Sequence, residues 1–140
     1  MVRRFLVKTY KGIHMKKLLI LLFSILISFN SYGEWKKFTS SVDNDIYYLD
    51  YDSIRVAGGY VYWLDMIDLA TITSSGAQSV EAYHQGDCDI FRIKHLNIIF
   101  YDQPMGKGNR DSFTPTEEWS YPPSNSASRK ILKEICNFKN

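Results

Sequence analysis

The chain has 140 residues, 45% of them hydrophobic, and a formal net charge of +2 at pH 7. That charge is unevenly placed, because residues 1–33 hold six of the 17 Lys and Arg residues and none of the 15 acidic ones. The remaining 107 residues carry 11 basic and 15 acidic side chains, which gives −4. A slightly acidic segment of this length predicts one domain, and it argues against nucleic-acid binding or attraction to anionic membranes.

Residues 15–33 have the order of a cleavable secretory signal peptide. The stretch KKLLILLFSILISF begins at Lys16 and joins two positive residues to a run of 12 apolar and small ones. Small residues at positions −3 and −1, the latter Gly33, then precede Glu34, as a signal peptidase requires. A transmembrane helix would need an apolar run of about 20 residues. We therefore expect cleavage between Gly33 and Glu34 and export of residues 34–140 as a single domain.

The segment before this signal is basic and has no hydrophobic period, so residues 1–14 are expected to be an untranslated or dispensable extension, with translation starting at Met15 rather than Met1. An Arg-Arg pair at residues 3–4 resembles a twin-arginine signal, but the apolar run begins too far downstream. A lipoprotein would need cysteine where this chain has Glu34. The exported domain is therefore expected to lack a stable membrane anchor, in the periplasm or at the cell surface.

Two cysteines remain after cleavage, Cys88 and Cys136. An even number of cysteines in an oxidising compartment predicts a disulfide bond. The alternatives are two free buried thiols or a zinc site completed by His84 and His95, whose irregular spacing is untypical of zinc. We expect the disulfide, and no metal or other cofactor.

The first half of the exported segment predicts an antiparallel meander. Turns are expected at 43–45, at 50–52 and at Gly58-Gly59, a pair that permits positive φ in a tight hairpin. Runs of β-branched and aromatic residues between these turns predict four strands. Their ranges are 35–38, 46–49, 53–56 and 60–69.

The middle of the chain predicts fewer and longer elements. Residues 70–86 indicate a loop followed by one strand, and residues 90–101 are the longest strand candidate. In the latter, the apolar side shifts by one residue near His95, which indicates a bulge or a strand buried on both faces. Residues 103–123 are rich in Gly, Pro and polar side chains and predict a long loop interrupted by residues 119–121.

The C-terminus predicts one helix. Residues Ser124 to Ser126 offer an N-cap, and Ile131, Ile135 and Phe138 follow at helical spacing. A disulfide at Cys136 would pin this helix to the start of the long strand. The expected fold is α+β, with an antiparallel sheet of about five or six strands and a C-terminal helix pinned by one disulfide.

The histidines and clustered aspartates are the candidates for catalysis and for calcium binding. Only His84 and His95 remain after cleavage, which limits acid–base catalysis near neutral pH, and both are expected to be surface or cross-strand residues. Four aspartates cluster in sequence, but tyrosines stand where an EF-hand loop needs oxygen ligands and glycine, so turn roles are expected. These aspartates are Asp43, Asp45, Asp50 and Asp52.

Other enzyme signatures are missing from the sequence. The segment Gly106-Lys107-Gly108 lacks the rest of a phosphate-binding loop, and no Gly-x-Ser-x-Gly motif occurs. We therefore expect a protein that is not an enzyme. The remaining signal is a set of aromatic residues that predict core or cross-strand pairs, with a few exposed to a partner. They are Tyr47, Tyr48, Tyr51, Tyr60, Tyr62, Trp63, Trp119 and Tyr121.

Several segments, taken together and in order, resemble the surface-adhesin protein E family of Gram-negative bacteria. The segments span nearly the whole exported chain and include the paired cysteines and a Trp-x-Tyr-x-Pro stretch. They are Glu34–Lys37, Tyr47–Asp50 with Ser53–Arg55, Val61–Trp63, Asp87-Cys88 before Phe91–Ile93, Tyr101 before Pro104–Gly108, Glu118–Pro123, and Ile131-Leu132 with Cys136.

The resemblance implies an antiparallel sheet with a C-terminal helix and a disulfide. It also implies an adhesin that binds host matrix or serum proteins and can form a homodimer, although no binding residues transfer by motif. The leading hypothesis is an exported non-enzymatic domain that binds host or envelope proteins through an exposed strand edge or an aromatic patch. The alternative is a periplasmic structural or stress-related accessory protein without a host ligand.

Overall fold

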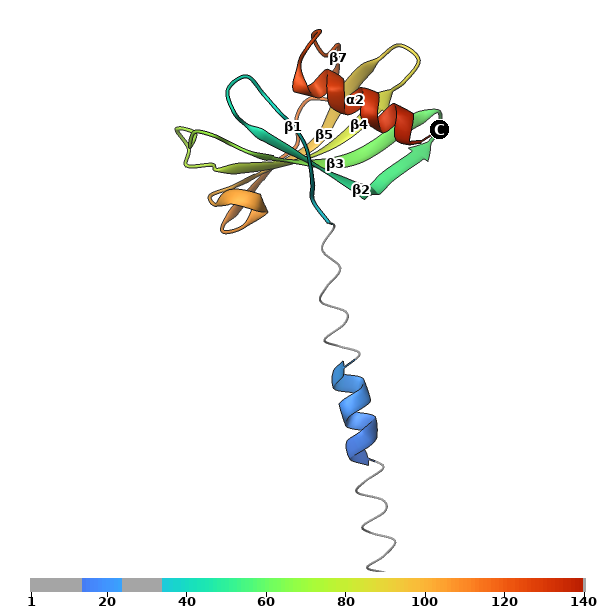
Figure 1. Ribbon diagram of the computed structural model, residues 1–140, viewed down its shortest axis with the longest axis vertical. Helices are drawn as coiled ribbons and strands as arrows, with labels where there is room; N and C mark the ends of the chain where they lie inside the picture. Colours follow the sequence, from blue (N-terminus) through green and yellow to red (C-terminus); the bar gives the residue numbers. More distant parts are fainter. Residues whose placement is uncertain (1–13, 24–33, 140) are drawn as a thin grey trace, which may run out of the picture. The chain divides into compact units, whose positions relative to one another are not determined.

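The computed structural model describes residues 14–23 and 34–139 (Figure 1). Residues 14–23 are helical and belong to a unit separate from the domain that follows. The expected extension up to residue 13 and the end of the expected signal peptide, including Gly33 of the cleavage site, lie outside the described residues. Among the described residues, no helix is long and apolar enough to cross a membrane.

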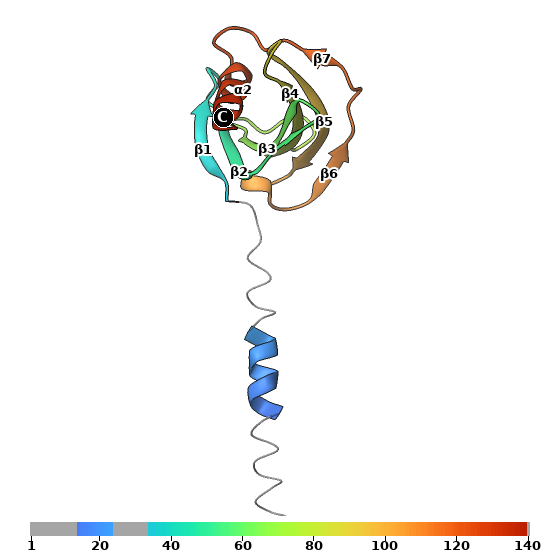
Figure 2. The ribbon, with the colours of Figure 1, turned by 90° about the vertical axis from the view of Figure 1, so that its right-hand side faces the viewer.

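The domain is built on one antiparallel sheet of seven strands, which confirms the expected fold class. Six strands lie side by side in chain order, and the seventh pairs with β5 on the side that β6 also uses. The sheet is strongly curved (Figure 2). The strands are β1 (Lys36–Ser40), β2 (Ile46–Ala57), β3 (Tyr60–Asp68), β4 (Ser79–Asp87), β5 (Arg92–Tyr101), β6 (Arg110–Phe113) and β7 (Trp119–Ser120).

The expected hairpin at Gly58-Gly59 is confirmed. Its two glycines join β2 to β3 with φ angles of 58° and 81°. Two consecutive residues with positive φ are the requirement of a type I′ turn, whose twist matches that of the flanking strands. The predicted loop and strand at 70–86 are confirmed as well, with β4 beginning at Ser79.

The predicted turn at 50–52 between two separate strands is wrong, because β2 continues through it. The register with β3 shifts between Asp50 and Arg55, so this stretch is a bulge within one strand. The Ser53 hydroxyl donates to the Asp50 carbonyl at 2.6 Å and accepts from the Leu64 backbone N–H at 2.9 Å. A side chain thus replaces the backbone partner that the bulge removes, and three strands stand where four were expected.

The phase shift near His95 is confirmed as a bulge. Tyr83 pairs with Asn97, whereas the next residue, His84, pairs with His95, so that Leu96 is the extra residue on β5. The prediction that residues 90–101 form the longest strand is wrong, because β2 has 12 residues and β5 has 10. The bulge keeps apolar side chains on one face of β5 while bringing the two histidines opposite each other.

The predicted long loop at 103–123 is wrong in part. It contains the short 3₁₀ helix η1 (Pro104–Gly106) and strand β6, in addition to β7 where the interruption was expected. The Ser79 hydroxyl accepts a hydrogen bond from the Gly106 backbone N–H at 2.9 Å, which holds η1 against β4. All four residues of β6 are exposed, so its sequence carries no alternation of apolar and polar residues that could reveal a strand.

The C-terminal helix α2 (Ala127–Phe138) is confirmed. Its N-cap is Ser126, whose hydroxyl accepts from the Arg129 backbone N–H at 3.1 Å. Its buried residues are Ile131, Leu132, Ile135 and Cys136. Phe138, expected in the same apolar stripe, is 54% exposed, and its ring lies 5.1 Å from that of Tyr51.

Helix α2 and η1 lie against opposite sides of the sheet (Figure 1). We call the side that α2 covers the inner face and the other side the outer face. The main core lies on the inner face, where α2 packs on residues of β2, β3 and β5. This core is made of Leu49, Val61, Trp63, Ile93, Ile131, Leu132, Ile135 and Cys136.

Gly86 of β4 lets the helix approach the sheet closely. A Cβ atom at this position would lie 2.8 Å from both Leu132 Cδ1 and Trp63 Cζ3, less than any real carbon contact. Glycine is therefore required here by space and not by backbone conformation. A second tether joins β2 to the helix, because Tyr51 in the bulge of β2 donates to Glu134 Oε1 at 3.0 Å. Burial, followed by this hydrogen bond to Glu134, raises the pKa of Tyr51 to about 12.

The predicted disulfide is present. Cys88 directly follows β4, and its bond to Cys136 joins the turn before β5 to the last turns of α2, with the two Cα atoms 5.8 Å apart. The bond closes a sequence separation of 48 residues. The helix is thus held at its middle by packing on Gly86 and near its end by a covalent bond.

Substitution Gly86→Ala should lower the free energy of unfolding by about 1–3 kcal/mol, because the added methyl group must displace Leu132 or Trp63. Urea denaturation followed by tryptophan fluorescence would measure the change. Gln85→Ala, at the neighbouring position on the outer face, serves as the control and should stay within about 0.5 kcal/mol of the parent. Equal effects of the two substitutions would contradict the close packing described for Gly86.

Replacing both cysteines, Cys88→Ser with Cys136→Ser, should lower the free energy of unfolding by about 4 kcal/mol, from the entropy of a loop of this length in the unfolded chain. Thermal unfolding of the oxidised parent, the reduced parent and the double variant would measure it. The reduced parent and the variant should unfold alike. A variant as stable as the oxidised parent would show that packing alone holds α2.

Candidate functional site

Three titratable side chains from adjacent strands meet on the inner face. Asp65 of β3 lies 2.8 Å from His84 of β4, measured from Oδ2 to Nε2. His84 in turn is joined to His95 of β5 by a contact of 2.9 Å between their Nδ1 atoms. The histidines are therefore a cross-strand pair, as expected, but they are not isolated surface residues. We call these three residues the Asp-His-His array.

The inner end of the array is deeply buried. Asp65 is 4% exposed and His84 is 6% exposed, whereas His95 reaches the surface. The Trp63 indole N–H donates to the same Asp65 oxygen at 3.2 Å, and its ring stacks on that of His84 with centroids 5.0 Å apart. The Nε2 atom of His84 lies close to the Asp65 carboxylate but off the direction of a hydrogen bond.

Burial lowers the pKa of His95, and the neighbouring His84 lowers it further, while Asp65 opposes both effects. His95 is therefore biased toward the neutral form near neutral pH. In a neutral pair, one Nδ1 must carry a proton and the other must accept it.

The array borders a cavity of about 150 Å³ between the sheet and the first turns of α2. Its other walls are mostly apolar and come from β2, β3, β4, β5 and the helix. They are formed by Tyr47, Trp63, Ile67, Val80, Ala82, Ile93, Ile98, Ser128 and Ile131. A mostly apolar cavity with a few convergent polar groups is the usual form of a small-ligand site.

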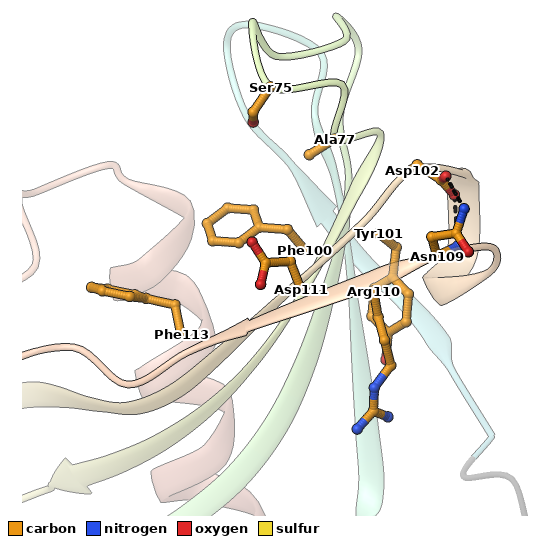
Figure 3. A pocket seen from close by; sticks show the side chains of 9 residues that line it. All are labelled: Ser75, Ala77, Phe100, Tyr101, Asp102, Asn109, Arg110, Asp111 and Phe113. Carbon is orange, nitrogen blue, oxygen red and sulfur yellow. Dashed lines mark hydrogen bonds between the residues drawn. The ribbon is translucent and has the colours of Figure 1, made fainter.

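A second, larger pocket of about 370 Å³ lies along the open edge of the sheet, at β6. Figure 3 shows Phe100, Asp111 and Phe113 on one side of β5 and β6, with Tyr101 and Arg110 on the other. This arrangement follows from the register, in which Phe100 faces Asp111 and Tyr101 faces Arg110. The loop before β6 is closed by Asp102, whose carboxylate accepts from the Asn109 backbone at 2.8 Å and from its side chain at 3.0 Å.

The outer face carries a cluster of aromatic and basic side chains around Trp119 of β7. The Arg92 guanidinium lies 4.3 Å from the Trp119 ring and the Lys94 ammonium 4.5 Å, both within the range of cation–π attraction. Tyr60 packs beside the same ring, with centroids 5.5 Å apart. Asp87 holds Arg92 in place through a contact of 3.0 Å between Oδ2 and Nε.

Two of the clustered aspartates accept hydrogen bonds from the backbone, one outside the sheet and one in the bulge of β2. Asp45 Oδ1 accepts from the Ala70 backbone N–H at 2.9 Å, and Asp50 Oδ1 accepts from that of Asp52 at 3.1 Å. Within the described ranges, no group of three or more His, Cys, Asp or Glu residues is arranged to hold a metal ion.

The family model of surface-adhesin protein E matches residues 35–137 of this chain. The chain belongs to the surface-adhesin protein E family. The match covers the whole sheet and all of α2 except its last residue. The resemblance inferred from the segments around Trp35, Cys88, Trp119 and Cys136 is thereby confirmed. No curated protein matches the chain.

Solved structures of a member of the surface-adhesin protein E family share this fold. Crystal form II of Haemophilus influenzae protein E superimposes with a TM-score of 0.58 at 19% identity, covering 79% of this chain and 94% of that one. Another structure of Haemophilus influenzae protein E gives a TM-score of 0.55 at 19% identity, with 77% and 87% of the two chains covered. At this level of identity the likeness establishes the fold.

The sequence analysis predicted surface or cross-strand histidines but missed the Asp-His-His array of this family member, because it did not associate them with Asp65. Asp65 and His84 are 19 positions apart in the sequence, and the sequence alone does not give the register of the strands. Asp65 is also not part of a recognisable sequence motif. The phase shift at His95 was the one available signal, because it marks the bulge that brings the two imidazoles together.

Lowering the pH should remove the contribution of Asp87 to stability. The Ile90 backbone N–H, together with Arg92 and the Asp89 N–H, lowers the pKa of the Asp87 carboxyl against the opposing effect of burial. A folded-state pKa below the unfolded value of about 3.9 stabilises the protein above that pH, and the stabilisation is lost as pH falls through the folded-state pKa. Asp87→Asn should therefore be less stable than the parent at pH 7 and equally stable at the acid end.

Urea denaturation at a series of pH values between about 2 and 7 would measure this convergence. Asp89→Asn, at the exposed neighbouring position, is the control and should follow the parent at every pH. A constant difference between the parent and Asp87→Asn across the series would contradict the lowered pKa.

Proposed function

We propose that the protein is an exported, non-enzymatic binding domain that acts as an adhesin at the bacterial surface and binds host or envelope proteins. Membership of the surface-adhesin protein E family supports the adhesin role. The expected signal peptide at residues 15–33 supports export. The observation that carries the binding role is the open edge of the sheet at β6.

Strand β6 has the properties of a strand that can accept another. It pairs with β5 on one side, and among the described residues no strand pairs with its other side. Its four residues are all exposed, so the outward backbone groups are accessible. An extended segment of a partner protein can add to such an edge through main-chain hydrogen bonds.

The pocket beside this edge supplies a place for side chains of the partner. Phe113 is 54% exposed and offers apolar contact at the end of β6, while Arg110 and Asp111 offer charges of both signs. Aromatic and arginine side chains are the types that most often dominate binding energy at protein interfaces. The edge therefore combines a general backbone interaction with specific side-chain contacts.

The surroundings of the histidines support a role other than catalysis. Within the described part of the chain, the polar contacts of His84 and His95 go to each other and to Asp65, and no hydroxyl or thiol is hydrogen-bonded to either ring. Nucleophilic catalysis needs such a group within hydrogen-bond reach of the base. Both cysteines are committed to the disulfide.

The binding role predicts that Phe113→Ala weakens capture of a protein partner by about tenfold, since exposed aromatic anchors commonly contribute this much. The assay would measure binding of the purified domain to a panel of immobilised host extracellular-matrix and serum proteins. Phe138→Ala is the matched control, because Phe138 is also 54% exposed but lies at the far end of α2. Equal losses from both variants would contradict a site at β6.

Fractionation of cells that express the full chain would test the location in parallel. The adhesin role requires the protein on the outer surface or in the medium, where an added protease can reach it. A protein confined to the periplasm that binds none of the panel would overturn the adhesin role and favour the accessory-protein alternative.

A further inference from the structure

The inner-face cavity is separate from the β6 edge and plays no part in the proposed function. Its volume of about 150 Å³ equals that of an engineered apolar cavity that binds benzene. The apolar walls come from Ile67, Val80, Ala82, Ile93, Ile98 and Ile131. A space of this size and character accommodates one six-membered ring.

The cavity is open to solvent on the side of His95. His95 is an exposed residue, and the lining residues Tyr47, Ile98 and Ser128 are only half-buried. The floor, in contrast, consists of buried groups, among them Ala82 and His84. A ligand can therefore enter beside His95 and bury its ring against the sheet.

The short contact between the histidines fixes where their protons lie. A distance of 2.9 Å between the two Nδ1 atoms requires one proton between them. The Asp65 carboxylate, 2.8 Å from Nε2 of His84, favours a proton on that nitrogen. In the neutral pair, Nδ1 of His84 is then the acceptor, and Nδ1 of His95 is the donor.

This assignment leaves one hydrogen-bond acceptor for a ligand. His95 donates through Nδ1, so its second ring nitrogen, Nε2, carries a lone pair. Burial and the neighbouring His84 lower the pKa of His95, which supports the neutral form. The Asp65 carboxylate accepts a hydrogen bond from the Trp63 indole N–H and faces Nε2 of His84. The open group is therefore a neutral acceptor at the mouth of an apolar cavity.

We propose that the inner-face cavity binds one small phenolic molecule, with its ring against the apolar walls and its hydroxyl donating to Nε2 of His95. A planar ring fits the volume, and a neutral O–H matches the acceptor without placing a second charge near Asp65. An aromatic carboxylate would be repelled by Asp65. The ligand is a free molecule rather than a tyrosine of a partner protein, because the cavity holds a ring and its hydroxyl but no attached backbone.

Titration of the oxidised domain with phenol and with toluene would test the site. The probes have similar rings, and only phenol has a donor. Side-chain NMR of the two histidines should show saturable shifts with phenol, with a dissociation constant on the order of 1 mM or below, and affinity about tenfold weaker for toluene. The nitrogen chemical shifts of the same rings report the tautomers, and His95 should have its proton on Nδ1.

Two variants separate the roles of volume and acceptor. Ala82→Val adds methyl groups to the buried floor with a residue that favours strands, and it should weaken both probes by about tenfold or more. His95→Leu removes the acceptor at an exposed position and should abolish the preference for phenol while keeping toluene binding. His95→Gln restores an acceptor oxygen and should recover part of the preference.

Several results would overturn the proposal. These are no saturable shift with phenol up to its solubility limit, equal affinity for phenol and toluene in the parent, or undiminished binding in Ala82→Val. Tighter binding of N-acetyltyrosinamide than of p-cresol would reject a free small molecule in favour of a tyrosine side chain. None of these results depends on host-protein capture at β6, so the two proposals fail independently.

Discussion

The contact between α2 and the inner face at Gly86 is the constraint on which the rest of the domain depends. Leu132 and Trp63 meet over this glycine with no room for a methyl group, and the Cys88–Cys136 bond holds the helix a turn farther along. A helix set at this depth covers one end of the inner face and leaves the other end open. The cavity exists because α2 stops covering the sheet where its first turn begins.

Two bulges adapt the strands to this helix. The one in β2 turns Tyr51 and Ile54 toward the core, where Tyr51 reaches Glu134. The one in β5 sets His95 opposite His84 and so completes the Asp-His-His array. A regular ladder would have sent the histidine of β5 to the opposite face, since side chains alternate along a strand. Both the core and the candidate ligand site therefore rest on local departures from ideal pairing.

Much of this fold could be predicted because its signals are local. The hairpin at Gly58-Gly59, the helix after Ser126 and the disulfide each depend on neighbouring residues or on composition. Strand β6 could not be predicted, because its four residues are exposed and form a strand only by pairing with the backbone of β5. The prediction of a turn at 50–52 was wrong because the continuation of β2 depends on a partner on the next strand, the Leu64 backbone N–H, which donates to Ser53. The array was hidden for the same reason, since only the register unites Asp65 with both histidines.

The serine hydroxyl in the bulge of β2 has a consequence for how this strand can change in evolution. Ser53 acts as a substitute for main chain, joining β2 to Leu64 where no peptide group is in register. Deleting the extra residues between Asp50 and Arg55 would restore a regular ladder without loss of hydrogen bonds between β2 and β3. It would, however, remove Tyr51, which donates to Glu134 of α2. The length of β2 is thus set by the helix rather than by the sheet. Related sequences that shorten this strand should therefore also change the residue at the position of Glu134.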